Sequence, residues 1–151
     1  MHHLDEGWTT LQISEVQTLN LFTPAQNSAD GNERSVAVFA EQQGRGVLLT
    51  ADLGKSGLHQ LLEAGLPGRS TLLKLPHHGS RHAHPELYLD RFKPTTAFVS
   101  SGHGNPYDFP HQQTLEACSK QQVRLLCTDL EGMLTFRFLD GGWQTRGAKA
   151  L

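Results

Sequence analysis

The 151-residue sequence lacks the features that mark a membrane span, a disulfide-stabilised domain or a strongly charged surface. Its two cysteines are too few for a disulfide framework. No apolar run approaches the roughly 20 residues needed to cross a bilayer. Acidic residues outnumber basic ones by 15 to 13, so no basic field attracts nucleic acid by charge alone. These absences predict one soluble globular domain, long enough to bury a hydrophobic core.

The two cysteines fall in regular structure. Cys118 lies in a predicted helix and Cys127 ends a predicted strand. A buried free thiol is the expected state of each, and a disulfide between them stays open. The histidines next to Met1, His2 and His3, are given no chemical role.

Strand and helix patterns alternate through the middle of the chain, from Val47 to Cys127. Short β-rich runs are interleaved with helical spacing of apolar residues at 58–66, 85–91 and 112–120. Before this region, β structure is predicted at 9–22 and 35–40, on either side of a loop at 24–34, and one strand is predicted after it at 133–138. The polar tail from Gly141 is expected to fray. This order predicts an α/β fold with a mixed sheet and flanking helices.

Six of the nine histidines lie between His77 and His111, and polar side chains follow the predicted strands. Asp52 ends the apolar run from Val47, and His77 and His78 follow the strand that ends at Leu75. Strand ends at one edge of an α/β sheet are where such folds place their sites. Imidazole nitrogen and carboxylate oxygen suit zinc or manganese. The pattern therefore predicts a metal site that activates water.

Each residue of this candidate site also has a plainer interpretation. Asp52 is either a metal ligand or the cap of the segment that follows. His77 and His78 point to opposite sides if the backbone is extended, so at most one of them faces the metal and the other orients a ligand or touches substrate. The plainer interpretation is two exposed loop histidines. Ser80 is either a turn-forming hydroxyl or a phosphate contact.

The polar residues from His103 onward also have both a chemical and a structural interpretation. His103 is either a proton donor to a leaving oxygen or a solvated loop imidazole. His111 belongs to the metal site or begins a helix after Pro110, and His82 and His84 are expected at the surface. Asn105 and Tyr107 either contact phosphate oxygens or form a turn. Asp129 is expected to orient a neighbouring side chain through a hydrogen bond.

Three motifs in fixed order carry a resemblance to a known family. They are Leu48 to Asp52, Leu75 to Ser80, which includes Pro-His-His-Gly-Ser, and Asn105 to His111. Together with Thr128-Asp129, they resemble the metallo-β-lactamase-like domain of the ComEC family of DNA-uptake competence proteins, over about residues 11–140. Two departures stand out. Ala51 replaces the usual glycine, and the metal motif His-x-His-x-Asp-His is absent.

The resemblance implies that residues 1–151 form one domain, the C-terminal part of an αββα sandwich whose N-terminal metal motif is missing. It implies a metal-dependent phosphodiesterase or nuclease, with zinc or manganese held weakly or not at all by this chain. The implied metal ligands are Asp52 and His77. The implied catalytic residues are His78, His103 and His111, with substrate contacts from Ser80, Asn105 and Tyr107 and support from Asp129.

The implied partners are DNA or another phosphodiester, the remainder of a parent protein in the bacterial cytoplasmic membrane, and a second copy of this chain. Two alternatives stay open. One is a non-catalytic interaction or nucleic-acid-contact module that binds no metal productively. The other is a hydrolase for a different ester, because histidines and an aspartate activate water for many substrates.

Overall fold

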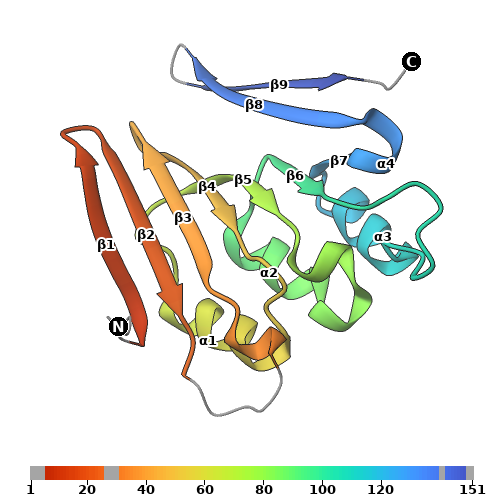
Figure 1. Ribbon diagram of the computed structural model, residues 1–151, viewed down its shortest axis with the longest axis horizontal. Coiled ribbons are helices and arrows are strands. Elements are labelled where there is room, and N and C mark those ends of the chain that lie inside the picture. Colours follow the sequence, from red (N-terminus) through yellow and green to blue (C-terminus); the bar gives the residue numbers. More distant parts are fainter. Residues whose placement is uncertain (1–5, 26–30, 140–141, 149–151) are drawn as a thin grey trace.

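The computed structural model describes residues 6–25, 31–139 and 142–148, and His2 and His3 lie outside this part. Seven strands form one sheet in chain order (Figure 1): β1 (Gly7–Ser14), β2 (Gln17–Thr23), β3 (Ala37–Gln42), β4 (Arg45–Leu49), β5 (Ser70–Lys74), β6 (Thr96–Val99) and β7 (Arg124–Cys127). Strands β1 to β4 pair antiparallel, and β4 to β7 pair parallel. The predicted α/β class with a mixed sheet is confirmed.

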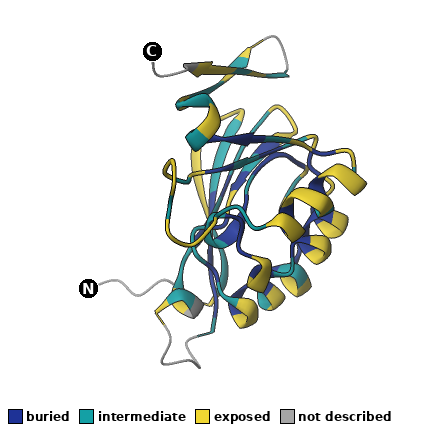
Figure 2. Ribbon diagram, turned by 90° about the vertical axis from the view of Figure 1, so that its right-hand side faces the viewer, coloured by how far each residue is buried: buried dark blue, intermediate teal, exposed yellow. Residues whose placement is uncertain are grey.

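Three helices connect the parallel strands, as crossover connections require. They are α1 (Lys55–Ala64), α2 (Pro85–Phe92) and α3 (Gln112–Lys120). All three lie on one side of the sheet (Figure 2). Shorter helical segments occupy the connections: η1 (Asn32–Arg34), η2 (Pro76–Gly79), η3 (Arg81–Ala83) and α4 (Thr128–Glu131). No helix in the described part of the chain is long and apolar enough to cross a membrane.

The hydrophobic core fills the space between the sheet and these helices. Phe39, Leu48, Leu73 and Ala97 are paired across four neighbouring strands and are all fully buried. They share one face because side chains alternate along a strand. Tyr88 of α2 is buried in the same cluster.

Both cysteines are buried and free, which confirms the expected thiols. Burial raises the pKa of Cys118 to about 11, with a further contribution from Cys127. Burial also raises the pKa of Cys127 to about 11, helped by the negative charges of Asp129 and Glu131. Both side chains therefore stay protonated and unreactive at neutral pH.

The prediction of a frayed C-terminal tail is wrong for residues 142–148. These residues form β9 (Gly142–Ala148), which pairs antiparallel with β8 (Met133–Leu139). The Trp143 ring packs against Phe138 at 5.3 Å, and Phe136 packs against Phe98 of the main sheet at 4.7 Å. A polar strand is stable here because its partner strand satisfies its backbone groups and its aromatic residue faces the sheet.

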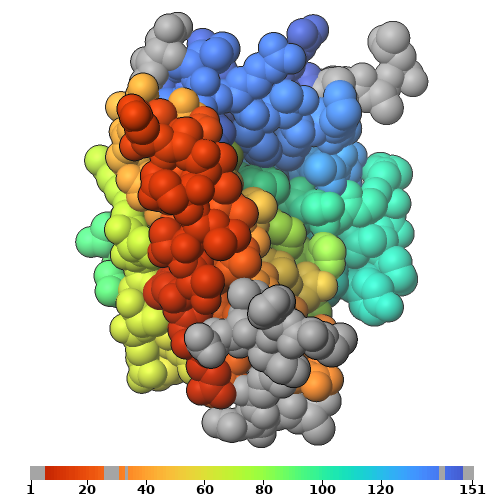
Figure 3. Space-filling view, turned by 60° about the vertical axis from the view of Figure 1, so that its left-hand side comes forward, coloured from red at the N-terminus to blue at the C-terminus, as the bar shows by residue number. Residues whose placement is uncertain are grey.

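The β8–β9 hairpin covers only part of the sheet face opposite the helices. In Figure 3 it lies above β1. Farther along this face the apolar residues are half-buried or exposed, and Leu49 is 36% and Leu11 45% accessible. Leu49 is paired with Val38 and Val38 with Leu21, so these side chains form a continuous apolar row.

We expect this apolar row to drive self-association, because a large uncovered apolar patch favours contact with a second copy. Light scattering of the wild-type chain should show a dimer or larger species at micromolar concentration. Leu49→Glu should shift the chain towards monomer. Leu87→Glu, a matched change at a 50% exposed leucine on α2, should not. A wild-type chain that stays monomeric over this concentration range would contradict the prediction.

Candidate functional site

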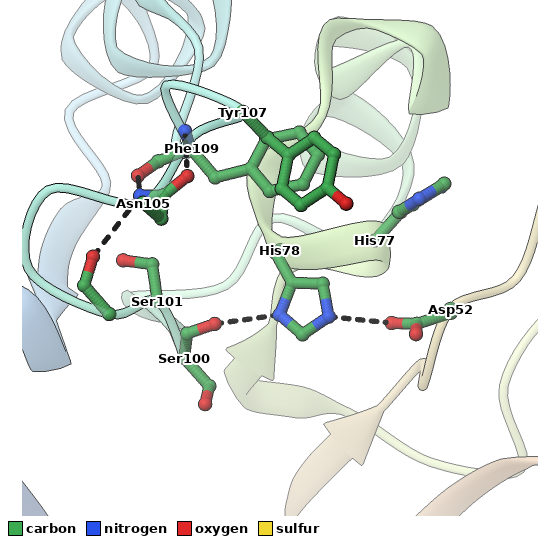
Figure 4. Close-up of a pocket in the computed structure, with 9 residues that line it drawn as sticks. Asp52, His77, His78, Ser100, Ser101, Asn105, Tyr107 and Phe109 are labelled. Atoms are coloured by element: carbon green, nitrogen blue, oxygen red, sulfur yellow. Dashed lines mark hydrogen bonds and ion pairs between the residues drawn. The ribbon is translucent and has the colours of Figure 1, made fainter.

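The candidate site lies where three neighbouring parallel strands end. Asp52 follows β4, His77 and His78 follow β5, and Ser100 and Ser101 follow β6. Because parallel strands have their carboxyl ends at the same edge of a sheet, their loops meet there. They form a cavity of about 690 Å³ (Figure 4), lined by Asp52, His77, His78, Ser100, Ser101, Gly102, Asn105, Tyr107 and Phe109.

The backbone at the paired histidines is not extended, contrary to the premise that they point to opposite sides. His77 has φ 46° and His78 φ 53°, both in the left-handed region. The His77 backbone N–H donates to the Ala51 carbonyl at 3.2 Å, which joins this turn to the segment after β4. Both histidines line the cavity. The tight turn, rather than strand alternation, decides where these side chains point.

Ala51 adopts a conformation that favours glycine. Its φ is 50°. A non-glycine residue in this region carries a cost of roughly 1 kcal/mol or more. Ala51, which stands where the family motif has glycine, therefore adopts the backbone conformation of glycine and is strained by it. The turn places Asp52 beside His78.

His78 is fixed between two partners. Its Nδ1 lies 2.7 Å from the Ser100 carbonyl oxygen and its Nε2 lies 3.5 Å from Asp52 Oδ1. A carbonyl oxygen only accepts, so Nδ1 carries a proton and donates it. In the neutral ring the Nε2 lone pair then faces the Asp52 carboxylate. Either a proton on Nε2 or a bound cation relieves that opposition.

The separation of these two atoms fits a metal ion. Tetrahedral zinc with nitrogen and oxygen ligands near 2.1 Å places neighbouring ligand atoms about 3.4 Å apart. The Nε2–Oδ1 distance of 3.5 Å is close to that value. A backbone carbonyl on the other ring nitrogen is the usual way to orient a ligand histidine. Yet no group of three or more His, Cys, Asp or Glu side chains within the described ranges is arranged to hold a metal.

A lysine shares the Asp52 carboxylate. Lys74 Nζ lies 4.0 Å from Asp52 Oδ1 and donates to the carbonyls of Ala51 at 3.1 Å and Leu75 at 3.3 Å. Burial lowers the pKa of Lys74, and the negative charge of Asp52 partly opposes that shift. Its ammonium group competes with any cation for Asp52.

Five of the nine predicted site residues line the cavity: Asp52, His77, His78, Asn105 and Tyr107. Asn105 also closes its own loop. Its Nδ2 donates to the Phe109 carbonyl at 2.8 Å, and its Oδ1 accepts from the Phe109 N–H at 2.9 Å. The Asn105 amide also donates to the Gly102 carbonyl at 3.2 Å, so both of its N–H groups are used by the turn, and its contact with a phosphate oxygen stays a prediction.

The other four predicted residues are not among those that line the cavity. His103 is exposed. The buried Ser80 hydroxyl accepts from the His82 N–H at 3.3 Å, as a turn-forming residue does. Asp129 accepts from the Ser101 hydroxyl at 3.2 Å and so contacts a residue of the cavity wall. The chemical roles assigned to them remain predictions.

His111 is held away from a charged state. Its Nδ1 accepts from the Arg81 backbone N–H at 3.1 Å. Partial desolvation, followed by the positive charges of Arg81 and His82, lowers the pKa of His111, while Asp108 opposes the shift. It also precedes the N-terminus of α3, where the helix dipole disfavours a cation. A neutral imidazole is a poor proton donor at neutral pH.

Four further residues line the cavity: Ser100, Ser101, Gly102 and Phe109. The strand-end pattern placed Ser101 and Gly102 at this edge without a specific chemical role, and Ser100 follows the same strand. Phe109 lies within the Asn105 to His111 motif, but its position over the paired histidines was not predicted. It enters the site because its loop folds back over His77 and His78, with ring centroids 5.9 Å from each.

The chain is similar in sequence to several known bacterial proteins. No family model matches the chain. The chain is 32% identical to ComE operon protein 3 of Bacillus subtilis over 128 residues, which are 85% of this chain and 16% of that protein. It is 31% identical to competence protein ComA of Neisseria gonorrhoeae over 118 residues, covering 78% of this chain and 17% of that protein.

A third relative is recombination protein 2 of Haemophilus influenzae. It is 26% identical over 145 residues, which are 96% of this chain and 18% of that protein. The chain thus spans about a sixth of the length of the relatives it matches. Fold and site together define an α/β domain with a histidine–aspartate cluster at the carboxyl edge of its sheet. The chain is related to the ComEC family of competence proteins.

Proposed function

We propose that this chain is the C-terminal part of a metal-dependent phosphodiesterase domain that cleaves DNA during uptake. The pairing of His78 Nε2 with Asp52 Oδ1 at 3.5 Å is the observation that carries this proposal. An imidazole nitrogen and a carboxylate oxygen at that separation would be two ligands of a hydrolytic metal site. The Ser100 carbonyl, on the other ring nitrogen, would orient the imidazole. The names of the relatives support the association with competence.

Different residues of this chain would have different roles in the proposed hydrolysis. Asp52 and His78 would hold the metal, and the Ser100 carbonyl would keep the His78 ring in place. A bound divalent cation supplies an activated water and polarises the phosphoryl oxygen. The Ser101 hydroxyl, on the same cavity wall, would exchange its hydrogen bond to Asp129 for one to a phosphate oxygen. His77 also lines the cavity and was the ligand predicted from sequence, so exchange of the roles of the two histidines is part of the test.

Two donors are fewer than the three that a catalytic zinc normally requires. The remaining ligands would come from the part of the fold that carries His-x-His-x-Asp-His. By itself this chain should therefore bind metal weakly. Competition from Lys74, which lies 4.0 Å from Asp52, adds to that weakness.

The test is metal binding by calorimetry, together with cleavage of DNA. The 151-residue chain should bind zinc or manganese weakly and cleave little or no DNA. Asp52→Ala or His78→Ala should weaken metal binding about tenfold or more. His59→Ala should leave binding unchanged, because His59 is exposed and paired with Glu63 on α1. A larger effect of His77→Ala than of His78→Ala would return the ligand role to His77.

DNA cleavage by a longer form of the protein, one that includes a His-x-His-x-Asp-His segment, is the decisive test of the phosphodiesterase proposal. We expect metal-dependent cleavage there that Asp52→Ala abolishes. Tight stoichiometric metal and DNA cleavage by the 151-residue chain alone would show instead that its own residues suffice.

A non-catalytic module is the second candidate. The lack of a three-ligand cluster in the described ranges favours it. It predicts binding of DNA or protein without metal-dependent cleavage in any form of the chain, so the same assay separates the two.

A further inference from the structure

An exposed aromatic ring forms one wall of the cavity. Tyr107 is 68% exposed, an unusual environment for so large a ring. It lies almost parallel to Phe109, with centroids 5.5 Å apart and an interplanar angle of 23°. Phe109 is in turn almost parallel to His78, at 5.9 Å and 21°. Three nearly parallel rings thus run from the surface to the candidate metal ligand (Figure 4).

The loop that carries these rings is held in shape by its own hydrogen bonds. The Asn105 side chain donates to and accepts from the Phe109 backbone and also donates to the Gly102 carbonyl at 3.2 Å. The Asp108 backbone is left-handed, with φ 55°, between the two stacked residues. A ring fixed before binding loses little conformational entropy when a ligand stacks on it.

The charge of the chain bears on how strongly a nucleic acid could bind at this cavity. The chain has a formal net charge of −2, so attraction of a phosphate backbone by lysine and arginine is weak. In the cavity wall, the negative charge of Asp52 lies 4.0 Å from the positive charge of Lys74, so the lysine is partly neutralised as a phosphate contact. Affinity for a nucleic acid at this site would need a contribution other than charge, and base–aromatic stacking is such a contribution.

We propose that Tyr107, supported by Phe109, is a stacking platform for one unpaired nucleobase, and that it makes the site selective for single-stranded nucleic acid. The proposal rests on the proposed function, because it assumes that the substrate is nucleic acid. A base inside a duplex is covered on both faces by its neighbours, whereas a base in a flexible single strand offers a face to the ring. Stacking of that base would hold the strand at the mouth of the cavity that His78, Ser101 and Asp52 line.

The experiment measures binding of fluorescent oligonucleotides by anisotropy in EDTA, so that neither metal nor cleavage takes part. The probes are a 12-nucleotide oligothymidylate, an abasic oligomer of the same length, and a blunt duplex. Wild type should bind oligothymidylate about tenfold more tightly than the abasic oligomer, or about 1.4 kcal/mol. That is within the range of one stacked base. The duplex should bind no better than the abasic oligomer.

Three variants assign the effect to the ring. Tyr107→Ala should lower the affinity for oligothymidylate about tenfold and leave the abasic oligomer unchanged. Tyr107→Trp should retain the preference. Leu87→Ala, at an exposed leucine on α2, should change neither affinity. Raised salt should weaken binding only slightly, because few phosphate charges are neutralised.

The outcomes separate the two proposals. Equal affinity of wild type for oligothymidylate and the abasic oligomer, with no effect of Tyr107→Ala, would overturn the platform while cleavage in the longer protein still supported the phosphodiesterase. Preferential duplex binding would likewise overturn it. A base preference that depends on Tyr107, without metal-dependent cleavage in any form, would support the platform and favour the non-catalytic module. Failure of every oligonucleotide to bind would overturn the platform.

Discussion

Gly79→Ala is expected to lower the free energy of unfolding by about 3 kcal/mol and to loosen the candidate site. Gly79 has φ +78°, and a Cβ there would lie 2.7 Å from Pro110 Cβ and 3.2 Å from Val99 Cγ2. The left-handed backbone costs a side chain roughly 1 to 2 kcal/mol. Overpacking against buried neighbours adds about 1 to 3 kcal/mol. Urea denaturation measures the sum.

Gly79→Ala should also disturb the candidate site, because two hydrogen bonds join Gly79 to the segment after Pro110. The Gly79 carbonyl accepts from the His111 N–H at 3.1 Å and from the Thr114 hydroxyl at 2.8 Å. They tie the paired-histidine turn to the loop that ends at α3. Displacement of Pro110 would therefore move Phe109 away from His78. NMR shifts of the His77 and His78 rings would report it.

Gly102→Ala is the matched control for this prediction. It lines the same cavity, but a Cβ there meets no atom within 4 Å and its φ is not left-handed. We expect a change in stability below about 0.5 kcal/mol. Equal loss of stability in Gly79→Ala and Gly102→Ala would contradict the proposed reason, because only Gly79 has both the strained φ and the close neighbours.

Phe39→Ala is expected to cost about 3 to 5 kcal/mol, the range for deletion of a buried phenylalanine side chain. Phe39 is fully buried on β3, and its ring lies 6.5 Å from that of Trp8. It also fills the space over Gly46, where a Cβ would lie 2.2 Å from the ring. Since single domains are stable by about 5 to 15 kcal/mol, a loss of this size is a large fraction of the total. Thermal and urea unfolding would measure it.

Tyr88→Phe is a suitable comparison at an equally buried aromatic residue. Within the described residues, the buried Tyr88 hydroxyl has no hydrogen-bond partner. Burial raises the pKa of Tyr88, with smaller contributions from Cys118 and Glu86, so the group stays neutral. Removal of an unpaired hydroxyl should change stability by less than about 1 kcal/mol, or increase it. A cost for Tyr88→Phe as large as that for Phe39→Ala would show that the hydroxyl has a partner.

Sequence patterns predicted the strands and helices of the middle region because each follows a simple periodicity. The predicted helix at 112–120 coincides with α3, and the strand predicted to end at Leu75 is β5, which ends one residue earlier at Lys74. The tail was different. The pairing of β9 with β8 and the packing of Trp143 depend on residues elsewhere in the chain, so a polar composition alone predicted fraying.

The sequence by itself determined the class of fold, the strand-end position of Asp52, His77 and His78, and the resemblance to one family, because periodicity and short motifs are local properties. The tertiary structure decided which histidine meets the carboxylate. It brought His78 rather than His77 to 3.5 Å from Asp52, through left-handed turns that strand alternation does not describe. It also placed Phe109 and Tyr107 over His78. The folding back of their loop depends on side-chain hydrogen bonds of Asn105 and on contacts with Gly79, which become visible only when distant segments meet.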